Sequence, residues 1–218
     1  ASDGALAISS TSNPDIIYGY YDDFDRTVNS ITKNGNFVYI PAGTEGLRAD
    51  LYIFDVADPF NPDLIQTISI LNDIIWKVEV SDNYAYAASE EGKVIILDVS
   101  NPETPIVVET IELQRAVNDV AIENNYLYVA NATNGLMIFN ITDPTDPIFL
   151  GSCTSPAVLQ CISVQNDYVF AGAMSLHPEW GGIMSFDVSD PTNPVFLSQA
   201  SLWSFPHDIK TVDGYSIT

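Results

Sequence analysis

One segment combines a histidine, a glutamate and a tryptophan and could bind a ligand. The chain has two histidines and three tryptophans, and His177 stands with Glu179 and Trp180 in the segment AGAMSLHPEWGG (171–182). An indole face beside imidazole and carboxylate groups suits stacking on a carbohydrate ring or binding of a cation. If the second histidine, His207, lies close to His177 and Glu179 in the fold, the two imidazoles and the carboxylate form a ligand set for Zn²⁺. A longer surface loop with an exposed aromatic is the other interpretation.

The segment YYDDFDRT (20–27) offers a different chemistry. Asp22, Asp23 and Asp25 supply the hard oxygen ligands that Ca²⁺ prefers. The segment lacks the glycine and the terminal glutamate of an EF-hand loop, and a solvated acidic loop is the alternative. The sequence thus suggests Ca²⁺ as a cofactor at this segment, although the fold requires none.

A third group of candidates begins the predicted innermost strands. His207, in LWSFPHDI (202–209), aligns with Asn118 and Gln160 of other repeats, and Trp76 begins the corresponding strand of a further repeat. We expect these side chains to surround the mouth of a central channel. The ligand-binding candidates are therefore Trp76, Asn118, Gln160, His177, Glu179, Trp180, His207 and Asp208.

The two cysteines, Cys153 and Cys161, are separated by a predicted loop. They could close a disulfide in an oxidising compartment. Cys153 falls where other repeats carry Ile68 or Ala200, so a small buried hydrophobic residue is the favoured interpretation.

Two sequons, Asn131-Ala-Thr and Asn140-Ile-Thr, predict N-glycosylation if the chain is secreted. Asn140 replaces an aspartate that the other full repeats carry at the same position. Chance sequons are common, so both sites remain open at this point.

Enzyme motifs are absent. The chain contains no GxSxG, no HExxH and no phosphate-binding loop. Carboxylate pairs serve as acid and base in polysaccharide hydrolysis, but with 29 acidic residues such a pair is always available. We therefore assign no catalytic residue.

The charge excludes some partners. Seven Lys and Arg residues face 29 Asp and Glu residues, for a net charge of −22. Such a surface repels nucleic acid and anionic lipid, and it suits cations, basic partners or a salty exterior. No apolar run is long enough for a transmembrane helix. The chain begins at Ala1 rather than Met, as a processed secreted protein or an excised segment would.

One turn sequence recurs four times and sets the period of the chain. DVSNPETP (98–105) is repeated at 55–62, 140–147 and 187–194, with spacings of 43, 42 and 47 residues. Each unit contains four short alternating segments rich in Val, Ile and Tyr, and none of ten or more residues shows helical periodicity. Four-stranded units of this length are typical of β-propeller blades. The Asp, Asn and Pro residues predict a tight corner before the outermost strand.

The two ends resemble half-units. Residues 5–20 resemble the last two strands of a unit and residues 207–218 the first two. We expect one all-β domain, a five-bladed propeller whose last blade is shared between the N- and C-terminal strands. A slice of a longer array is the alternative, because the final strand stops early at Thr218. The predicted boundaries are a half-blade at 1–20, full blades at about 28–70, 76–113, 118–155 and 160–202, and a half-blade at 207–218.

These elements resemble the LVIVD repeat. In that family a strand of the type LxIxDV enters a DP…P corner, and the next unit opens with DVAV and YAYVA. Here the elements read VIILDVSNPETP, NDVAIENNYLYVAN (118–131) and DIKTVDGYSIT, and the resemblance covers nearly the whole chain. It implies a propeller in a surface or secreted protein, and it brings no shared catalytic motif. Ala7 stands where the family expects Asp.

The expected function is a non-catalytic extracellular or cell-surface module that assembles with itself or binds a glycan, a protein or Ca²⁺ on its top-face loops. The top face is the end of the blades opposite the repeated turn sequence. If outer strands carry the assembly, apolar residues should point outward there. The alternative is a polysaccharide hydrolase or lyase that uses top-face carboxylates.

Overall fold

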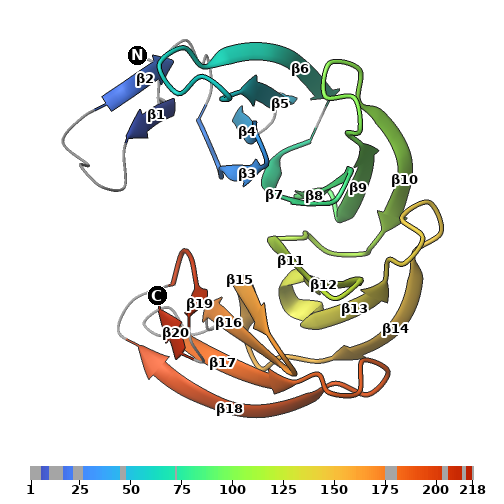
Figure 1. Ribbon diagram of the computed structural model, residues 1–218. Coiled ribbons are helices and arrows are strands. Elements are labelled where there is room, and N and C mark those ends of the chain that lie inside the picture. The colour runs from blue at the N-terminus through green and yellow to red at the C-terminus, as the bar shows by residue number, and fades with distance from the viewer. Residues whose placement is uncertain are drawn as a thin grey trace.

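The chain folds into an arc of antiparallel sheets. The computed structural model describes residues 6–9, 17–21, 27–44, 48–71, 73–174, 181–202, 206–212 and 215–217. Four four-stranded sheets follow one another around the arc, with a two-stranded sheet at each end (Figure 1). Within the described residues the only helical segment is the 3₁₀ turn η1 (Ala132–Asn134), and no helix is long and apolar enough to span a bilayer. The predicted all-β architecture of four-stranded blades is confirmed.

Each four-stranded sheet is one blade, whose strands a to d run in chain order from the channel to the rim. Blade 1 contains β3 (Thr32–Asn34), β4 (Phe37–Thr44), β5 (Arg48–Asp55) and β6 (Asp63–Leu71). Blade 2 contains β7 (Ile75–Ser81), β8 (Tyr84–Ser89), β9 (Lys93–Asp98) and β10 (Ile106–Glu112). Blade 3 contains β11 (Asp119–Glu123), β12 (Tyr126–Ala130), β13 (Leu136–Asn140) and β14 (Ile148–Cys153). Blade 4 contains β15 (Val158–Gln165), β16 (Tyr168–Met174), β17 (Gly181–Asp187) and β18 (Val195–Leu202).

The two-stranded end sheets pack on the outermost blades. β1 (Leu6–Ser9) pairs with β2 (Ile17–Tyr21), and Leu6 is buried against blade 1. β19 (Lys210–Val212) pairs with β20 (Tyr215–Ile217), and the Thr211 backbone N–H donates to the Ser163 hydroxyl of blade 4 at 3.1 Å. The described strands of the two end sheets do not pair with each other. The closed five-bladed ring therefore stays a prediction.

The a–b turns are short because their residues tolerate a left-handed backbone. Gly35, Asp82, Asn124 and Asn166 stand at the same turn position and have φ between 51° and 57°. Asn and Asp adopt this conformation more readily than other non-glycine residues, and Gly does so without steric cost. The sequence thus predicts where strand a reverses into strand b.

Each c–d corner is held by side-chain to backbone hydrogen bonds, as the repeated turn sequence predicts. In blade 2, Asp98 accepts from the Ser100 N–H at 2.8 Å and Asn101 accepts from the Glu103 N–H at 3.2 Å. The other three blades make the same pair of contacts at the equivalent positions. Such contacts fix the chain reversal locally, without help from the rest of the fold.

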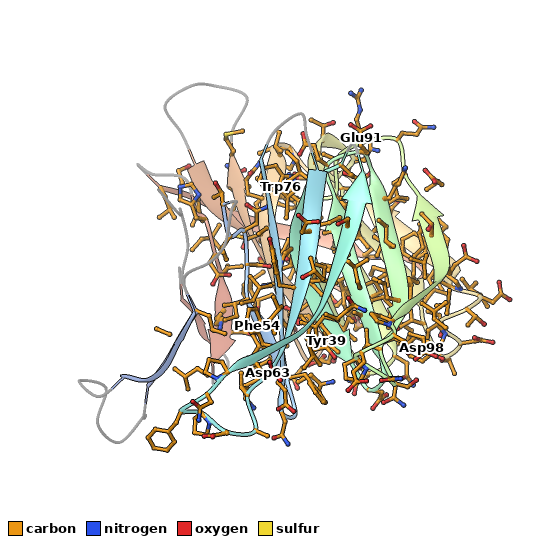
Figure 2. All side chains as sticks on the ribbon, turned by 90° about the horizontal axis from the view of Figure 1, so that it is seen from above. Tyr39, Phe54, Asp63, Trp76, Glu91 and Asp98 are labelled. Carbon is orange, nitrogen blue, oxygen red and sulfur yellow. The ribbon has the colours of Figure 1, made fainter. Side chains whose placement is uncertain are left out.

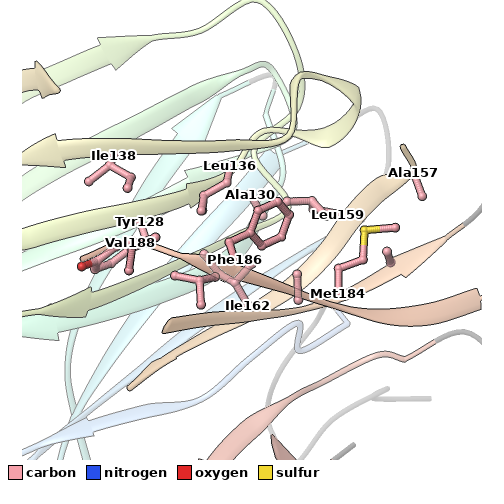
Figure 3. Close-up of a cluster of buried hydrophobic side chains, with 13 residues drawn as sticks. Tyr128, Ala130, Leu136, Ile138, Ala157, Leu159, Ile162, Met184, Phe186 and Val188 are labelled. Atoms are coloured by element: carbon pink, nitrogen blue, oxygen red, sulfur yellow. The ribbon is translucent and has the colours of Figure 1, made fainter. Parts of the chain in front are cut away.

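The apolar core lies between blades. Tyr128 and Ile138 of blade 3 pack with Val169 and Phe186 of blade 4 in one buried cluster (Figure 3). Two equivalent clusters join blades 1 and 2 and blades 2 and 3, and a smaller one joins β1 to blade 1. A single blade would expose both faces, so the stability of each blade depends on its neighbours.

Two of the corners contact the outer strand of the preceding blade. Gln66 Nε2 of β6 donates to the Glu103 carbonyl in the corner of blade 2 at 2.6 Å. Gly151 of β14 lies so close to the corner of blade 4 that an added Cβ would be 2.6 Å from the Thr192 carbonyl oxygen. A corner that looks local in sequence therefore also joins two blades.

Candidate binding site at the mouth of the central channel

The inner strands surround a cavity of about 290 Å³ that adjoins a second one of about 480 Å³. Figure 2 places Trp76 and Glu91 at the end of the blades opposite to Asp63 and Asp98, so the mouth lies away from the repeated corners. The residue at the same repeat position in each successive unit lines both cavities. These residues are Asn29, Trp76, Asn118, Gln160 and His207. The structure thus brings together Trp76, Asn118, Gln160 and His207, and Asp208 lines the smaller cavity with them.

Trp76 and Gln160 are presented by irregularities in their strands. The pairing of β7 with β8 shifts between Ile75 and Lys77, which makes Trp76 the extra residue of a β-bulge. Gln160 is the extra residue at the same place in β15. Bulges re-aim side chains at sites of this kind. Trp76 is 36% exposed, and its indole Nε1 donates to Glu90 Oε2 at 2.5 Å, so the side chain is partly accessible and its orientation is restrained.

The two asparagines at the mouth link neighbouring blades. Asn29 Nδ2 donates to the Ile75 carbonyl at 2.8 Å, and Asn118 Nδ2 donates to the Leu159 carbonyl at 2.6 Å. Each bond runs from one blade to the residue that precedes the bulge in the next. These contacts set the position of Trp76 and Gln160 across the mouth.

A layer of charged residues lies beneath the mouth. Lys77 and Lys210, two of the seven basic residues of the chain, line the channel with Glu79 and Asp208. Lys77 Nζ lies 3.4 Å from Glu79 Oε1. Burial pulls the pKa of Lys77 down, but the carboxylates of Asp119, Glu79 and Asp208 outweigh it and the pKa is raised. Burial raises the pKa of Glu79, and Lys77 offsets part of that effect.

Asp119 is the buried member of this layer. Its Oδ2 accepts from the Ile162 N–H of blade 4 and its Oδ1 from the Val120 N–H, each at 2.8 Å. Burial raises the pKa of Asp119 to about 7, although Lys77 and the two N–H groups favour the charged form. A carboxyl group with this pKa can hold or release a proton near neutral pH.

Six predicted site residues lie outside the described residues and are not placed. They are the loop residues His177, Glu179 and Trp180 and the acidic residues Asp22, Asp23 and Asp25. Among the described residues, no group of three or more His, Cys, Asp or Glu side chains is arranged to hold a metal ion.

The disulfide alternative is wrong in this structure, where Cys153 and Cys161 are both free. Cys153 is half-buried on the outer strand β14, whereas Cys161 is buried on the inner strand β15, so the two thiols stand at opposite radial ends of neighbouring blades. Burial raises the pKa of Cys161 to about 12. Proximity in sequence did not reveal this separation, because the connecting loop crosses from rim to channel.

Glycosylation at Asn131 stays a prediction, and the folded chain does not present this side chain to solvent. Asn131 is 0% exposed, and its Nδ2, the atom that a glycan would modify, donates to the Arg115 carbonyl at 2.6 Å. Asn140 instead lies at a c–d corner, where its Oδ1 accepts from the Thr142 N–H at 2.8 Å. It therefore replaces the corner aspartate without loss of the turn, and glycosylation there stays a prediction.

Sequence reasoning missed Asn29, Lys77, Glu90 and Lys210. The repeat alignment contains the signal for two of them, since Asn29 shares the position of Trp76 and Lys77 shares that of Asp119. Glu90 and Lys210 carry no such signal, because their role depends on which side chains the arc brings near them.

Comparison with known proteins agrees with this architecture. A family model described as the LVIVD repeat matches residues 25–69, 74–112, 114–155 and 160–200, one match for each four-stranded blade. No curated protein matches the sequence.

The structure is similar to the crystal structure of the computationally designed Ika4 protein. The TM-score is 0.60 at 12% sequence identity, over 77% of this chain and 95% of that chain. In all, 623 solved chains match, so the architecture is widespread and does not by itself specify a function.

Proposed function

The chain belongs to the LVIVD repeat family, and we propose that it is a non-catalytic binding module of an extracellular or cell-surface protein, with a glycan as its ligand at the channel mouth. The acidic charge of −22 and the low content of Lys and Arg favour an exterior location and argue against nucleic acid. Binding of Ca²⁺ by Asp22, Asp23 and Asp25 is part of the same proposal.

The observation that carries the glycan proposal is the presentation of Trp76. Its indole is fixed by Glu90, lies on a bulge and lines a cavity whose other lining residues are mostly polar, with amide, imidazole, carboxylate and ammonium groups among them. Sugar rings bind to such sites through stacking of their C–H faces on an aromatic ring and hydrogen bonds to polar side chains. Ser30 Oγ adds to this, since it lines the cavity and is buried without a hydrogen-bond partner among the described residues.

Calorimetric titration with neutral and acidic oligosaccharides tests the proposal. We expect Trp76→Ala to weaken the binding of the recognised oligosaccharide about tenfold or more, and Trp76→Phe to retain most of it. Phe60→Ala is the matched control, because Phe60 is a 60% exposed aromatic residue in a c–d corner. Equal affinity of Trp76→Ala and the wild type, or an equal loss in Phe60→Ala, contradicts the proposal.

We also propose that β1–β2 and β19–β20 are the outer and inner halves of one blade, which closes a five-bladed ring. The proposal is supported by the positions of the two end sheets, which pack on the two ends of the row of four blades. β1 packs on blade 1 through Leu6 and Ile8, and β19 packs on blade 4 through Thr211. Backbone nuclear Overhauser contacts between β1 and β20 are expected in the monomer. Contacts that occur only between two isotope-labelled copies exclude closure within one chain.

A second candidate function is polysaccharide hydrolysis or elimination, favoured by one observation. Asp119, with a pKa of about 7, and Asp208 line the same cavity. A carboxyl group that is partly protonated at neutral pH beside a second carboxylate is the arrangement that glycoside hydrolysis uses. Reducing-end release from polysaccharides that is lost in Asp208→Asn supports this candidate, and binding without release in the wild type excludes it.

A further inference from the structure

The outer rim of blades 2, 3 and 4 exposes apolar side chains at one repeated place. The first residue of each outer strand is largely solvent-exposed, at 64% for Ile106, 57% for Ile148 and 47% for Val195. Val107 and Phe149 follow the first two of these and are 54% and 50% exposed. Figure 1 shows β10, β14 and β18 forming the outer perimeter of the arc, so the exposed positions recur once in each of these blades along that perimeter. We call this surface the rim, formed by Ile106, Val107, Ile148, Phe149, Val195 and Leu197.

The rim is rigid. The Phe149 ring packs edge to face on Phe139 of the adjacent strand, with centroids 5.5 Å apart, and Phe196 does the same on Phe186 at 5.7 Å. A proline immediately precedes each of these outer strands and fixes the backbone at the point where the strand begins. Exposed apolar groups that are already ordered cost little conformational entropy when a partner binds them.

The outer strands do not favour pairing with another strand. Each carries a β-bulge close to its exposed first residue, where Val108, Leu150 and Leu197 are the extra residues. Bulges disrupt the regular row of backbone donors and acceptors that an added strand would need. A partner of the rim is therefore bound through side chains.

Each exposed apolar group is accompanied by negative charge. The segments 98–107, 140–149 and 187–197 each contain two carboxylates and no Lys or Arg. Hydrogen bonds from Ser100, Thr145 and Ser189 lower the pKa values of Asp98, Asp143 and Asp187. These corners therefore remain charged at neutral pH and repel an acidic partner.

We propose that the rim is a docking surface for a basic protein segment that carries alternating apolar and Lys or Arg residues. Charge complementarity selects this occupant over a second copy of the chain, since each copy carries a net charge of −22. The apolar residues of the segment pack on Ile106, Ile148 and their neighbours, and its basic residues lie on the corner carboxylates. The blade period sets the spacing of these contacts. The rim lies away from the channel mouth, so this proposal stands independently of ligand binding there.

The test uses a fluorescent peptide with three Leu-Leu-Lys-Lys units separated by Gly-Ser linkers, and a matched peptide with Ser in place of Leu. Fluorescence anisotropy of the intact chain is expected to show tighter binding of the Leu peptide. In the variant with Ile106→Ser and Ile148→Ser, its affinity should fall about tenfold to the level of the Ser peptide. Met174→Ser, which changes a 37% exposed residue at the far end of β16, is the control and should bind as the wild type does.

Three results overturn the proposal. The first is equal affinity for the two peptides, which means that charge alone holds them. The second is an equal loss in Met174→Ser and in the rim variant. The third is sedimentation in which the wild type dimerises, increasingly so at high salt, while the rim variant stays monomeric, because a second copy is then the occupant. Reduced affinity in Glu103→Gln with Asp146→Asn, together with a weaker salt dependence, supports the charged half of the proposal.

Discussion

Asp119→Asn should change the pH dependence of stability more than any other single substitution in the channel. The carboxyl group is buried between blades 3 and 4 and accepts hydrogen bonds from Ile162 and Val120. An asparagine of the same shape can keep one of these bonds and presents an N–H group to the other donor. That local loss lowers the free energy of unfolding by the same amount at every pH. The informative quantity is therefore the slope of the free energy of unfolding against pH.

The magnitude follows from the shift of the Asp119 pKa. Its value is about 7 in the folded chain and roughly 3.9 in an unfolded chain, because burial disfavours the charged form. A raised carboxyl pKa means that the folded state holds the proton more tightly. The contribution to stability is therefore fully present below about pH 4 and is lost as the pH rises towards 7. A shift of about three units corresponds to about 4 kcal/mol.

Urea unfolding of the wild type and the variant between about pH 4 and pH 8 measures this contribution. We expect the wild-type free energy of unfolding to fall relative to Asp119→Asn by about 4 kcal/mol over that range. Asp98→Asn is the contrast, and its curve should run parallel to the wild-type curve over this range, because the contribution of Asp98 changes only below about pH 4. Hydrogen bonds from Ser100 lower the pKa of Asp98, so its stabilising contribution is present at neutral pH and is lost in acid. Parallel curves for Asp119→Asn and the wild type would refute a buried, proton-binding carboxyl group at this position.

Two further predictions concern packing and thiol chemistry. Gly151→Ala should lower the free energy of unfolding by about 1–3 kcal/mol, because its Cβ would be 2.6 Å from the Thr192 carbonyl oxygen. Gly35→Asn should be nearly neutral, since no atom lies within 4 Å of an added Cβ there. Urea denaturation of the two variants checks this, and equal losses of stability would contradict the close contact between Gly151 of β14 and the corner of blade 4. Cys153 should react with a maleimide much faster than Cys161, which is buried and has a pKa of about 12, and reductant should not shift the melting temperature. Equal labelling rates, or a melting temperature that falls on reduction, would contradict two free thiols on different strands.

The local elements could be predicted from sequence because their causes are local. The left-handed turn at Asn124 and the corner hydrogen bond at Asp98 need only the residues beside them. Alignment of the repeats then predicted that Trp76, Asn118, Gln160 and His207 begin inner strands, and the structure places all four around one mouth. Equivalent positions in stacked blades face the same axis. Residues that recur at one position of the repeat therefore lie close together in the fold.

The rest depends on contacts between blades, which no single repeat contains. Lys77, Asp119 and Lys210 come from three different units, and their charges interact only because the arc brings those units around one channel. The burial of Asn131 and the separation of Cys153 from Cys161 have the same origin. The sequence by itself determined the strands, their order and the corners, since these follow from residue type and period. The tertiary structure alone decided which polar groups are buried, which carboxyl group holds a proton near neutral pH and which apolar residues face solvent, because burial and electrostatic interaction are sums over neighbours from other blades.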